Sequence, residues 1–497
     1  MKSKVLLLAV SLTLGASLPL FAQFHPVECY ITSPDGTMLL SRDRGPLEFT
    51  PGLGDGKNLP IVVDPRQKFQ EMIGFGYALT GGSAELMMKM SPSARKGLIH
   101  ELFSSDEGCL GISHIRLTVG ASDMNSFVFS YDDMPEGEED WDLGHFSLSQ
   151  DLVDVVPVMK EILKVNPGLQ IIASPWSAPA WMKTTGDVRG GQLRAQCYDV
   201  YARYFVRYIE EMAKEGIHIS AITIQNEPLN SRNTPSMFWF PEQQGEFVGK
   251  HLGPRLRERG LDTKIVIFDH NCDRPDYPLS VLSDNGAAQY VDGIAFHHYM
   301  GSPSAMTWVH QARPEVDILF TEQMIVERGE GAQTRQIAST VKRMLVDIPR
   351  NWSRNVILWN LAADPSAGPH TGNGGCPFCF GAVTIDGDNY TRNIAYYTLA
   401  HASAFIPSGS ERIYSTDEGD PGIVLFEDEQ RPEVDRAIRY DRAGVLPNVA
   451  FLTPGGKVVL IVSNTTSSSV PVKVQYKGMT FGRSLESGAV ATFIWDK

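Results

Sequence analysis

The sequence predicts an α/β protein: a (β/α)8 TIM barrel with an attached β-sandwich domain formed by both ends of the chain. Two patterns carry this prediction. Between residues 71 and 411, short apolar runs alternate with stretches of helical periodicity, and eight such units fit a closed barrel. After residue 412, alternating segments separated by Gly, Ser, Asn and Pro are typical of antiparallel sheet. The expected barrel strands are 73–78, 115–119, 170–173, 221–224, 264–268, 293–296, 317–320 and 356–360.

Helices are expected between these runs, because apolar residues recur there with the period of an α-helix. Ser91-Pro92 places a capping hydroxyl before a proline, so a helix should begin there. An open, doubly wound sheet is the alternative architecture. It is disfavoured because Gly74-Phe75-Gly76 lacks the third glycine of a phosphate-binding turn. The clearest helical stretches are 198–214, 241–259 and 334–347.

The two ends of the chain complete the predicted domain organisation. Alternation is clearest over 458–462, 470–475 and 490–495. Residues 24–70 also look strand-like and could complete the same sheet, which would make the barrel an insertion. The predicted divisions are a signal peptide (1–23), the first part of the β-sandwich domain (24–70), the catalytic barrel (71–411) and the second part of the sandwich (412–497).

Charge and the N-terminal segment restrict the partners and the location. The 497 residues carry a formal charge of −14, which argues against nucleic acid, because binding it requires basic patches. Lys2 and Lys4 precede an apolar stretch that ends near Ala22, the pattern of a cleaved signal peptide. No other stretch approaches the ~18 apolar residues of a membrane span. We therefore expect an exported protein, periplasmic or secreted, and soluble after processing.

Six cysteines are too few for a disulfide scaffold in a chain of 497 residues. Cys376 and Cys379, three positions apart, could form a local disulfide, half of a zinc site, or two free thiols. Structural zinc requires a second ligand pair at short spacing, and the sequence offers none. We favour the disulfide and predict no metal site.

Two glutamates stand where barrel enzymes place their reactive groups, at the C-terminal ends of strands. Glu227 follows the fourth apolar run in Gln225-Asn226-Glu227-Pro228, and Glu322 follows the seventh. A carboxylate buried there is costly without a partner or a function. A pair of carboxyl groups is what cleavage of a glycosidic bond requires, one as acid and one as nucleophile.

The remaining strand ends resemble a sugar site. Aromatic faces can stack on sugar rings, while Asp, Asn and Arg can hold hydroxyl groups. His297 and His298 are adjacent in a strand, so their rings point to opposite faces and cannot both bind one ion. His298 is therefore expected to be structural. The candidate residues at the strand ends are Arg116, Asp123, Trp176, Trp181, Asn226, His297, Tyr299, Trp359 and Asn360.

In these motifs the chain resembles glycoside hydrolase family 30. The similarity spans nearly the whole barrel in the same order, and it extends to the β domain, which in this family is built from both chain ends. The matching segments are Ile115-Arg116-Leu117, Ser122-Asp123, 129–133, 146–148, 174–183, 225–228, His297-His298-Tyr299, Thr321-Glu322 and 359–362.

The resemblance implies a retaining β-glycosidase without a metal or an organic cofactor. It implies that Glu227 is the general acid/base, that Glu322 is the nucleophile, and that Asn226 holds the 2-hydroxyl of the sugar. On charge grounds, Glu322 should be ionised beside Arg116, and Glu227 should be protonated. Residues matched to the innermost sugar subsite, or to orienting the nucleophile, are Arg116, Asp123, Trp176, His297, Tyr299 and Trp359.

Among substrates, β-1,6-glucan is predicted first. The acidic loop over residues 132–142 and the scarcity of basic residues at the strand ends fit a neutral glucan better than a uronic-acid polymer. The alternatives within the family are a glucosylceramidase, a β-glucosidase or a β-xylosidase. A non-catalytic carbohydrate-binding protein is the alternative from another class, disfavoured because binding alone needs no two opposed glutamates.

Overall fold

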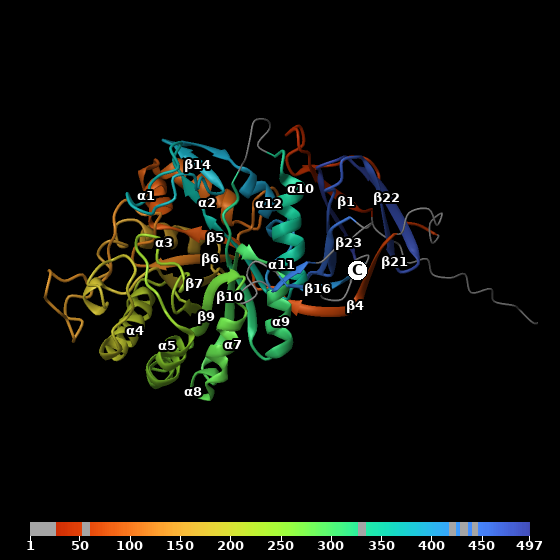
Figure 1. The fold of residues 1–497 in the computed structure, drawn as a ribbon. Helices are drawn as coiled ribbons and strands as arrows, with labels where there is room; N and C mark the ends of the chain where they lie inside the picture. Colours follow the sequence, from red (N-terminus) through yellow and green to blue (C-terminus); the bar gives the residue numbers. More distant parts are fainter. Residues whose placement is uncertain (1–25, 52–59, 327–333, 417–423, 428–435, 440–445) are drawn as a thin grey trace, which may run out of the picture.

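The computed structural model describes residues 26–51, 60–326, 334–416, 424–427, 436–439 and 446–497 (Figure 1). The predicted signal peptide, residues 1–23, lies outside the described residues. Figure 1 shows two parts side by side: a barrel wrapped by helices, and a twisted sheet built largely from the last part of the chain.

The barrel contains the eight strands that the apolar runs predicted, all parallel and in chain order. Hydrogen bonds between the regions of the seventh and eighth strands, which stand at the two ends of the sheet order, close the ring. Arg354 N donates to the carbonyl oxygen of Ile318 (2.9 Å), and Trp359 N donates to the carbonyl oxygen of Gln323 (3.0 Å). The strands are β5 (Gly74–Leu79), β6 (His114–Val119), β7 (Gln170–Pro175), β8 (Ala221–Thr223), β9 (Lys264–Cys272), β10 (Val291–Gly301), β11 (Asp317–Glu322) and β12 (Asn355–Asn360).

Helices follow most of the strands and cover the outside of the barrel (Figure 1). The side chain of Ser91 accepts a hydrogen bond from Ala94 N at the start of α2, as its position before Pro92 predicted. The long helix expected over 198–214 is α4, with those bounds. The helices are α1 (Gly81–Lys89), α2 (Pro92–Phe103), α3 (Val155–Val165), α4 (Tyr198–Lys214), α5 (Pro241–Glu246), α6 (Gly253–Glu258), α7 (Asp276–Ser283), α8 (Asn285–Ala288), α9 (Ser304–Ala312), α10 (Ile337–Val341), α11 (Asp347–Arg350) and α12 (Ile394–Ser403).

Two expected helices are interrupted by π-helical turns, at Phe247–Leu252 and at Lys342–Val346. A proline follows each turn. Pro254 and Pro349 have no N–H to donate to the carbonyl four residues earlier, so the helical ladder is locally rearranged. The expectation of regular helices over 241–259 and 334–347 was therefore incomplete.

Strands from both ends of the chain share one ten-stranded sheet, in the order β2-β1-β23-β20-β19-β16-β4-β21-β22-β3. β4 links the two halves of this sheet, because it pairs antiparallel with β16 and parallel with β21. The bounds are β1 (Glu28–Thr32), β2 (Ser41–Arg42), β3 (Thr50–Pro51), β4 (Ile61–Glu71), β16 (Glu411–Ser415), β19 (Asn448–Leu452), β20 (Lys457–Ser463), β21 (Val470–Tyr476), β22 (Met479–Leu485) and β23 (Val490–Asp496).

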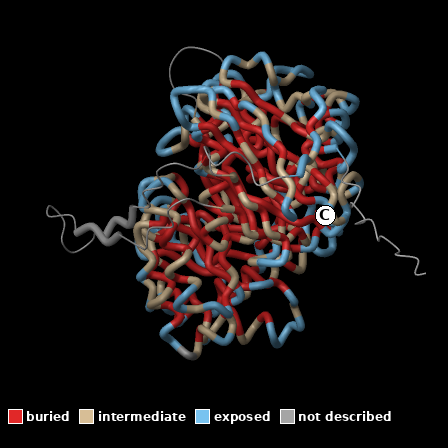
Figure 2. The backbone as a smooth tube through the Cα atoms, turned by 90° about the vertical axis from the view of Figure 1, so that its right-hand side faces the viewer, coloured by how far each residue is buried: buried red, intermediate tan, exposed pale blue. Residues whose placement is uncertain are grey.

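Two small sheets complete the described strands. One joins β13 (Ala362–Ala363), β14 (Val383–Asp386) and β15 (Asn389–Arg392), and the other pairs β17 (Val424–Glu427) antiparallel with β18 (Arg436–Arg439). Figure 2 shows buried segments running through the interior of the molecule and exposed segments at its periphery. Within the part of the chain that the structure describes, no helix has the length and apolar character needed to cross a membrane.

Buried polar contacts join the barrel to the ten-stranded sheet. The two ring nitrogens of His401, on α12, lie 2.9 Å from the hydroxyl of Thr492 and 2.8 Å from that of Thr32. Arg350 on α11 donates to the carbonyl oxygens of Ser415 and Asn448. Because these contacts reach both N-terminal and C-terminal strands, the barrel packs against a sheet made by both ends.

Candidate active site

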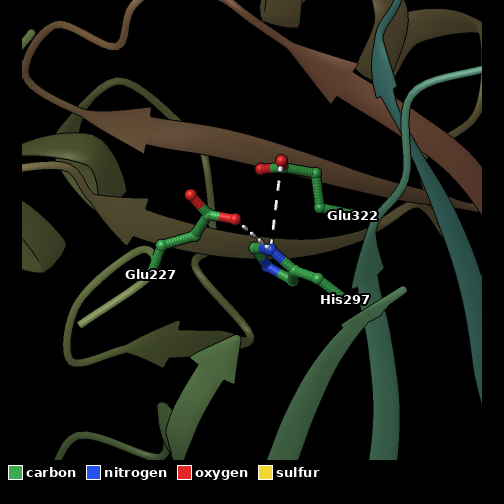
Figure 3. A group of neighbouring side chains, drawn as sticks. All are labelled: Glu227, His297 and Glu322. Atoms are coloured by element: carbon green, nitrogen blue, oxygen red, sulfur yellow. Dashed lines mark hydrogen bonds and ion pairs between the residues drawn. The ribbon is translucent and has the colours of Figure 1, made fainter. Parts of the chain in front are cut away.

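The two predicted glutamates face one cavity at the C-terminal ends of the barrel strands. Glu227 follows β8 and Glu322 ends β11, and Figure 3 shows the imidazole of His297, from β10, between their carboxyl groups. The cavity measures about 440 Å³. Its lining residues are Asp123, Trp176, Glu227, Asn230, Asn233, Asn271, Tyr299, Met300, Glu322, Met324, Trp359 and 374–379.

Glu322 is held by two donors. Arg116 Nη1 lies 2.6 Å from Glu322 Oε2, and the hydroxyl of Tyr299 donates to Oε1 at 2.9 Å. Both carboxylate oxygens thus act as acceptors. The Arg116 guanidinium is fully buried and lies 4.9 Å from the ring centre of Trp176 and 5.9 Å from that of Trp359, so the two rings also favour its charge.

Asp269, within β9, is a central residue that the sequence reasoning missed. Its carboxylate accepts from Arg116 Nη2 (2.7 Å), from Thr321 Oγ1 (2.6 Å) and from a ring nitrogen of His297 (3.0 Å). The hydroxyls of Ser174 and Thr223 also donate to it. Its position directly after the fifth apolar run was the available signal, the same one that identified Glu227 and Glu322.

The imidazole of His297 is protonated, and carboxylates surround it. Burial disfavours its charged form, but Glu322, Asp269 and Glu227 outweigh burial and raise the pKa of His297 to about 9. The imidazolium therefore donates from Nε2 to Asp269 and from Nδ1 to Glu227 Oε1, which lies 3.3 Å away.

Glu227 is charged in the free site. Burial raises its pKa, yet hydrogen bonding and the positive charge of His297, with His270 and the Asn230 amide, lower that pKa to about 2. The Asn230 side chain donates to Glu227 Oε2 at 2.6 Å. The expectation of a protonated Glu227 was wrong for the free site, because the extra proton lies on His297. The pKa of Glu322 is raised, since burial outweighs the opposing effects of His297 and Arg116.

One oxygen of Glu227, one oxygen of Glu322 and a nitrogen of His297 all lie within 4.8 Å of one another. Among the described residues, this is the group with the spacing of a metal site. A cation there would compete with Arg116, which already pairs with Glu322, and with the proton on His297 Nδ1. The donors therefore suit a proton and a substrate better than a metal ion.

Asp123, Trp176 and Trp359 line the cavity, as their positions in the sequence predicted. Burial and the nearby charges of Glu322 and Glu227 raise the pKa of Asp123 to about 8. At neutral pH its carboxyl group is therefore mostly protonated and can both donate and accept hydrogen bonds.

Three other sequence candidates act beside the cavity. Asn226 accepts from Arg116 Nη2 at 2.8 Å. The ring nitrogen of Trp181 donates to Asp132 instead of pointing into the cavity, so its expected place at the sugar site was wrong. Asn360 Oδ1 accepts from the hydroxyls of Thr80 and Ser83, a structural role in the barrel.

Cys376 and Cys379 form a disulfide, the interpretation favoured from the sequence. Sequence reasoning did not place this loop at the site, although residues 374–379 line the cavity. Asn230, Asn233, Asn271 and Met300 were also missed as lining residues. Asn230 and Asn233 lie in the loop after β8, whose path no local sequence pattern specifies. Asn271 and Met300 lie in the last residues of β9 and β10, beyond the apolar runs that marked those strands.

Comparisons with known proteins agree with this geometry. The profile described as the glycosyl hydrolase family 30 TIM-barrel domain matches residues 72–406, and that of the family's β-sandwich domain matches residues 431–493. An endo-1,6-β-D-glucanase from Aspergillus fumigatus is 30% identical over 97% of this chain and 99% of its own. The mouse lysosomal acid glucosylceramidase is 29% identical over 88% of this chain and 84% of its own.

A solved structure described as an endo-β-1,6-glucanase is 32% identical, with a TM-score of 0.82, covering 95% of this chain and 99% of that one. A family 30 xylanase from Talaromyces cellulolyticus shares the fold at 21% identity, with a TM-score of 0.65, covering 88% of this chain and 100% of that one. The barrel profile alone spans more than half of the chain. The paired glutamates, Arg116 and the aromatic residues of the cavity all lie within the residues that it matches. The chain belongs to glycosyl hydrolase family 30 and is a glycosidase.

Proposed function

We propose that this glycosidase cleaves β-1,6-linked glucan with retention of configuration, with Glu322 as nucleophile and Glu227 as general acid/base. The observation that carries the proposal is the spacing of the two carboxyl groups, which bring an oxygen each to within 4.8 Å. Retaining enzymes hold these groups about 5 Å apart, whereas inverting enzymes leave room for a water molecule between acid and base sites.

In the first step the Glu322 carboxylate, held by Arg116 and Tyr299, attacks the anomeric carbon. A carbon–oxygen bond to Glu322 forms as the glycosidic bond breaks, and Glu227 gives a proton to the leaving oxygen. His297 Nδ1, 3.3 Å from Glu227 Oε1, is the source of that proton in the free site.

In the second step a water molecule replaces the leaving sugar. Glu227, now a carboxylate, takes a proton from the water as its oxygen attacks the anomeric carbon. The bond to Glu322 breaks, and the sugar leaves with its original configuration. Arg116 stabilises the Glu322 carboxylate that is released.

The cavity lining supports a neutral sugar as substrate. Asp123 offers a carboxyl group to hydroxyls, while Trp176 and Trp359 offer ring faces at the inner end of the cavity. Among the described residues that line the cavity there is no lysine or arginine. A uronic-acid polymer would need such a cation to offset the buried carboxylates.

The relatives support the linkage, because two similar proteins of nearly full coverage are named as endo-1,6-β-glucanases. We further propose that residues 24–70 and 412–497 form the β domain around a catalytic barrel at 71–411. Residues 1–23 would direct export to the periplasm or the exterior before their removal, and a glucan polymer would then be met outside the cell.

Digestion of defined polymers tests the proposal. The enzyme should release oligosaccharides from β-1,6-glucan faster than from xylan, cellulose or glucuronoxylan, with product sizing by chromatography. Glucosylceramide in detergent serves as a separate arm, given the similarity to the mouse glucosylceramidase. Preferred release of xylo-oligosaccharides, or hydrolysis of the lipid alone, would overturn the proposed substrate.

A further inference from the structure

A loop closed by a disulfide forms one wall of the catalytic cavity. Residues 374–379 line the cavity, and the disulfide joins Cys376 to Cys379 within that loop. Buried Cys379 packs in one apolar cluster with Trp176, Trp359 and Met324. The loop therefore lies against the rings proposed to hold the inner sugar.

Contacts on both sides fix the path of this loop. Asn360 Nδ2, at the end of β12, donates to the carbonyl of Cys379 at 3.0 Å. Thr371 N donates to the carbonyl of Asp123 at 2.9 Å. A Cβ at position 375 would lie 2.4 Å from the carbonyl oxygen of Thr371, so glycine is required where the loop passes this segment. The cavity wall is thus built to hold one conformation.

Phe378 stands at the tip of the loop, between the two cysteines. The residue is 54% exposed, although it lines the cavity. With Tyr299 and Met324 it also lines an adjoining hollow of about 330 Å³. The hydroxyl of Tyr299 is engaged by Glu322, so the Tyr299 ring is fixed beside the reacting centre. The exposed ring of Phe378 therefore lies at the boundary between the catalytic cavity and the adjoining hollow.

We propose that Phe378 is the stacking platform of a second sugar subsite, on the leaving-group side of the cleaved bond, and that the disulfide loop holds its ring in place. The inference rests on the proposed glucanase function. Trp176, Trp359 and Asp123 are each less than 10% exposed and occupy the deep part of the cavity. The sugar joined to the inner one through the cleaved bond must then pass the exposed rim, where Phe378 lies.

Substrates with and without a second sugar separate this role from catalysis. Phe378→Ala should lower kcat/KM for β-1,6-linked glucose oligosaccharides roughly tenfold, mainly through KM, as expected for a lost aromatic contact. Hydrolysis of β-glucosyl fluoride should not change, because fluoride occupies no second subsite. Phe378→Trp should retain the wild-type values. Phe380→Ala is the matched control, since Phe380 directly follows the loop and is 40% exposed but lines neither hollow.

Acceptor reactions distinguish a failure of this inference from a failure of the proposed function. The glucosyl-enzyme formed from β-glucosyl fluoride can be intercepted by added glucose or a β-1,6-linked disaccharide, which then occupy the leaving side. In the wild type, the added acceptor should increase the rate at which the glucosyl-enzyme turns over. Phe378→Ala should reduce this rate increase roughly tenfold. If the wild type fails to cleave β-1,6 oligosaccharides, the proposed glucanase function is wrong, while the acceptor reaction still measures the subsite.

The double variant Cys376→Ser/Cys379→Ser tests the part played by the disulfide. It should show the oligosaccharide and acceptor losses of Phe378→Ala when each rate is divided by the variant's own rate of β-glucosyl fluoride hydrolysis, and thermal unfolding reports correct folding. Unchanged acceptor kinetics in Phe378→Ala, or equal losses in Phe380→Ala, would overturn the stacking platform. Wild-type acceptor kinetics in the double variant would overturn the role of the disulfide.

Discussion

His297 at the barrel mouth and His401 at the contact between the barrel and the ten-stranded sheet are both fully buried, yet their charge states are opposite. Carboxylates surround His297 and raise its pKa to about 9 against the effect of burial. His401 lies between the hydroxyls of Thr32 and Thr492, and burial lowers its pKa to about 3. The partners of a buried histidine, more than its depth, decide whether it holds a proton.

The difference between the two histidines indicates that the barrel mouth serves activity and that the domain contact serves stability. The mouth gathers groups of opposite charge around a cavity, where a proton and a covalent bond can be exchanged with substrate. At the contact between domains, His401 makes neutral hydrogen bonds to two hydroxyls, and Arg350 donates to backbone carbonyls. These bonds satisfy buried groups and join the two parts. Substitutions at the mouth should therefore change activity, and substitutions at the domain contact should change stability.

The largest effect is expected for Glu322→Gln. The amide keeps the shape of the side chain but cannot attack the anomeric carbon, so turnover should fall by several orders of magnitude. Steady-state kinetics on an aryl β-glucoside measures the loss, and thermal unfolding serves as the control. Activity within tenfold of the wild type would remove Glu322 from the nucleophile role.

Glu227→Ala should lose roughly 10²–10⁴-fold on a glucan, whose leaving group needs protonation. The loss should be smaller on an aryl glucoside with an acidic leaving group. Azide should restore turnover and give a β-glycosyl azide, detectable by NMR, because a small anion can attack without a general base. Equal losses on both substrates, without azide rescue, would contradict an acid/base role.

Asp269→Asn should lower kcat roughly 10²-fold with little change in KM, since misplacing catalytic groups has about this effect. Asp269 is not among the residues that line the cavity. It positions Arg116 and His297, which donate to its two oxygens. The acid and base limbs of the pH–rate profile should also move, because loss of its charge lowers the pKa of His297. An unchanged pH profile would indicate a purely structural role.

His401→Gln should have the smallest effect and a different readout, a loss of about 1–3 kcal/mol in unfolding free energy at pH 7.5 with unchanged KM. The folded pKa of His401 is lowered from 6.5 to about 3, so its contribution is complete above pH 6.5 and is lost as pH falls toward 3. Urea unfolding should show the difference between wild type and variant shrinking by about 1 kcal/mol per pH unit below pH 6.5. The same difference at pH 7.5 and 5.5 would contradict a neutral, buried His401.

The sequence predicted the barrel well because its strands are buried on both faces and therefore appear as continuous apolar runs, as in β6 and β12. The π-helical turns before Pro254 and Pro349 were missed, since helical periodicity carries no information on where the backbone ladder shifts. The order of strands in the second sheet depends on pairing between residues hundreds of positions apart, which local patterns do not encode.

Within the site, the strand ends identified Glu227, Glu322 and four of the residues that line the cavity with them: Asp123, Trp176, Tyr299 and Trp359. Asp269 was missed although it directly follows the fifth apolar run, because no second motif drew attention to it. Trp181 was placed at the sugar by its neighbourhood in the chain, but its side chain turns to Asp132. The protonation of Glu227 also depended on a contact with His297 that only the folded chain brings about.

Covalent trapping tests the central claim most directly. A 2-deoxy-2-fluoro-β-glucoside with a good leaving group should inactivate the enzyme, because fluorine slows hydrolysis of the glycosyl-enzyme more than the chemistry of its formation with an activated leaving group. Mass spectrometry of peptides should then find the 2-fluoroglucosyl group on Glu322, and NMR of a normal glycoside digest should show the β-anomer as first product. A label on another residue, or an α-anomer as first product, would contradict the proposed pairing of Glu322 with Glu227.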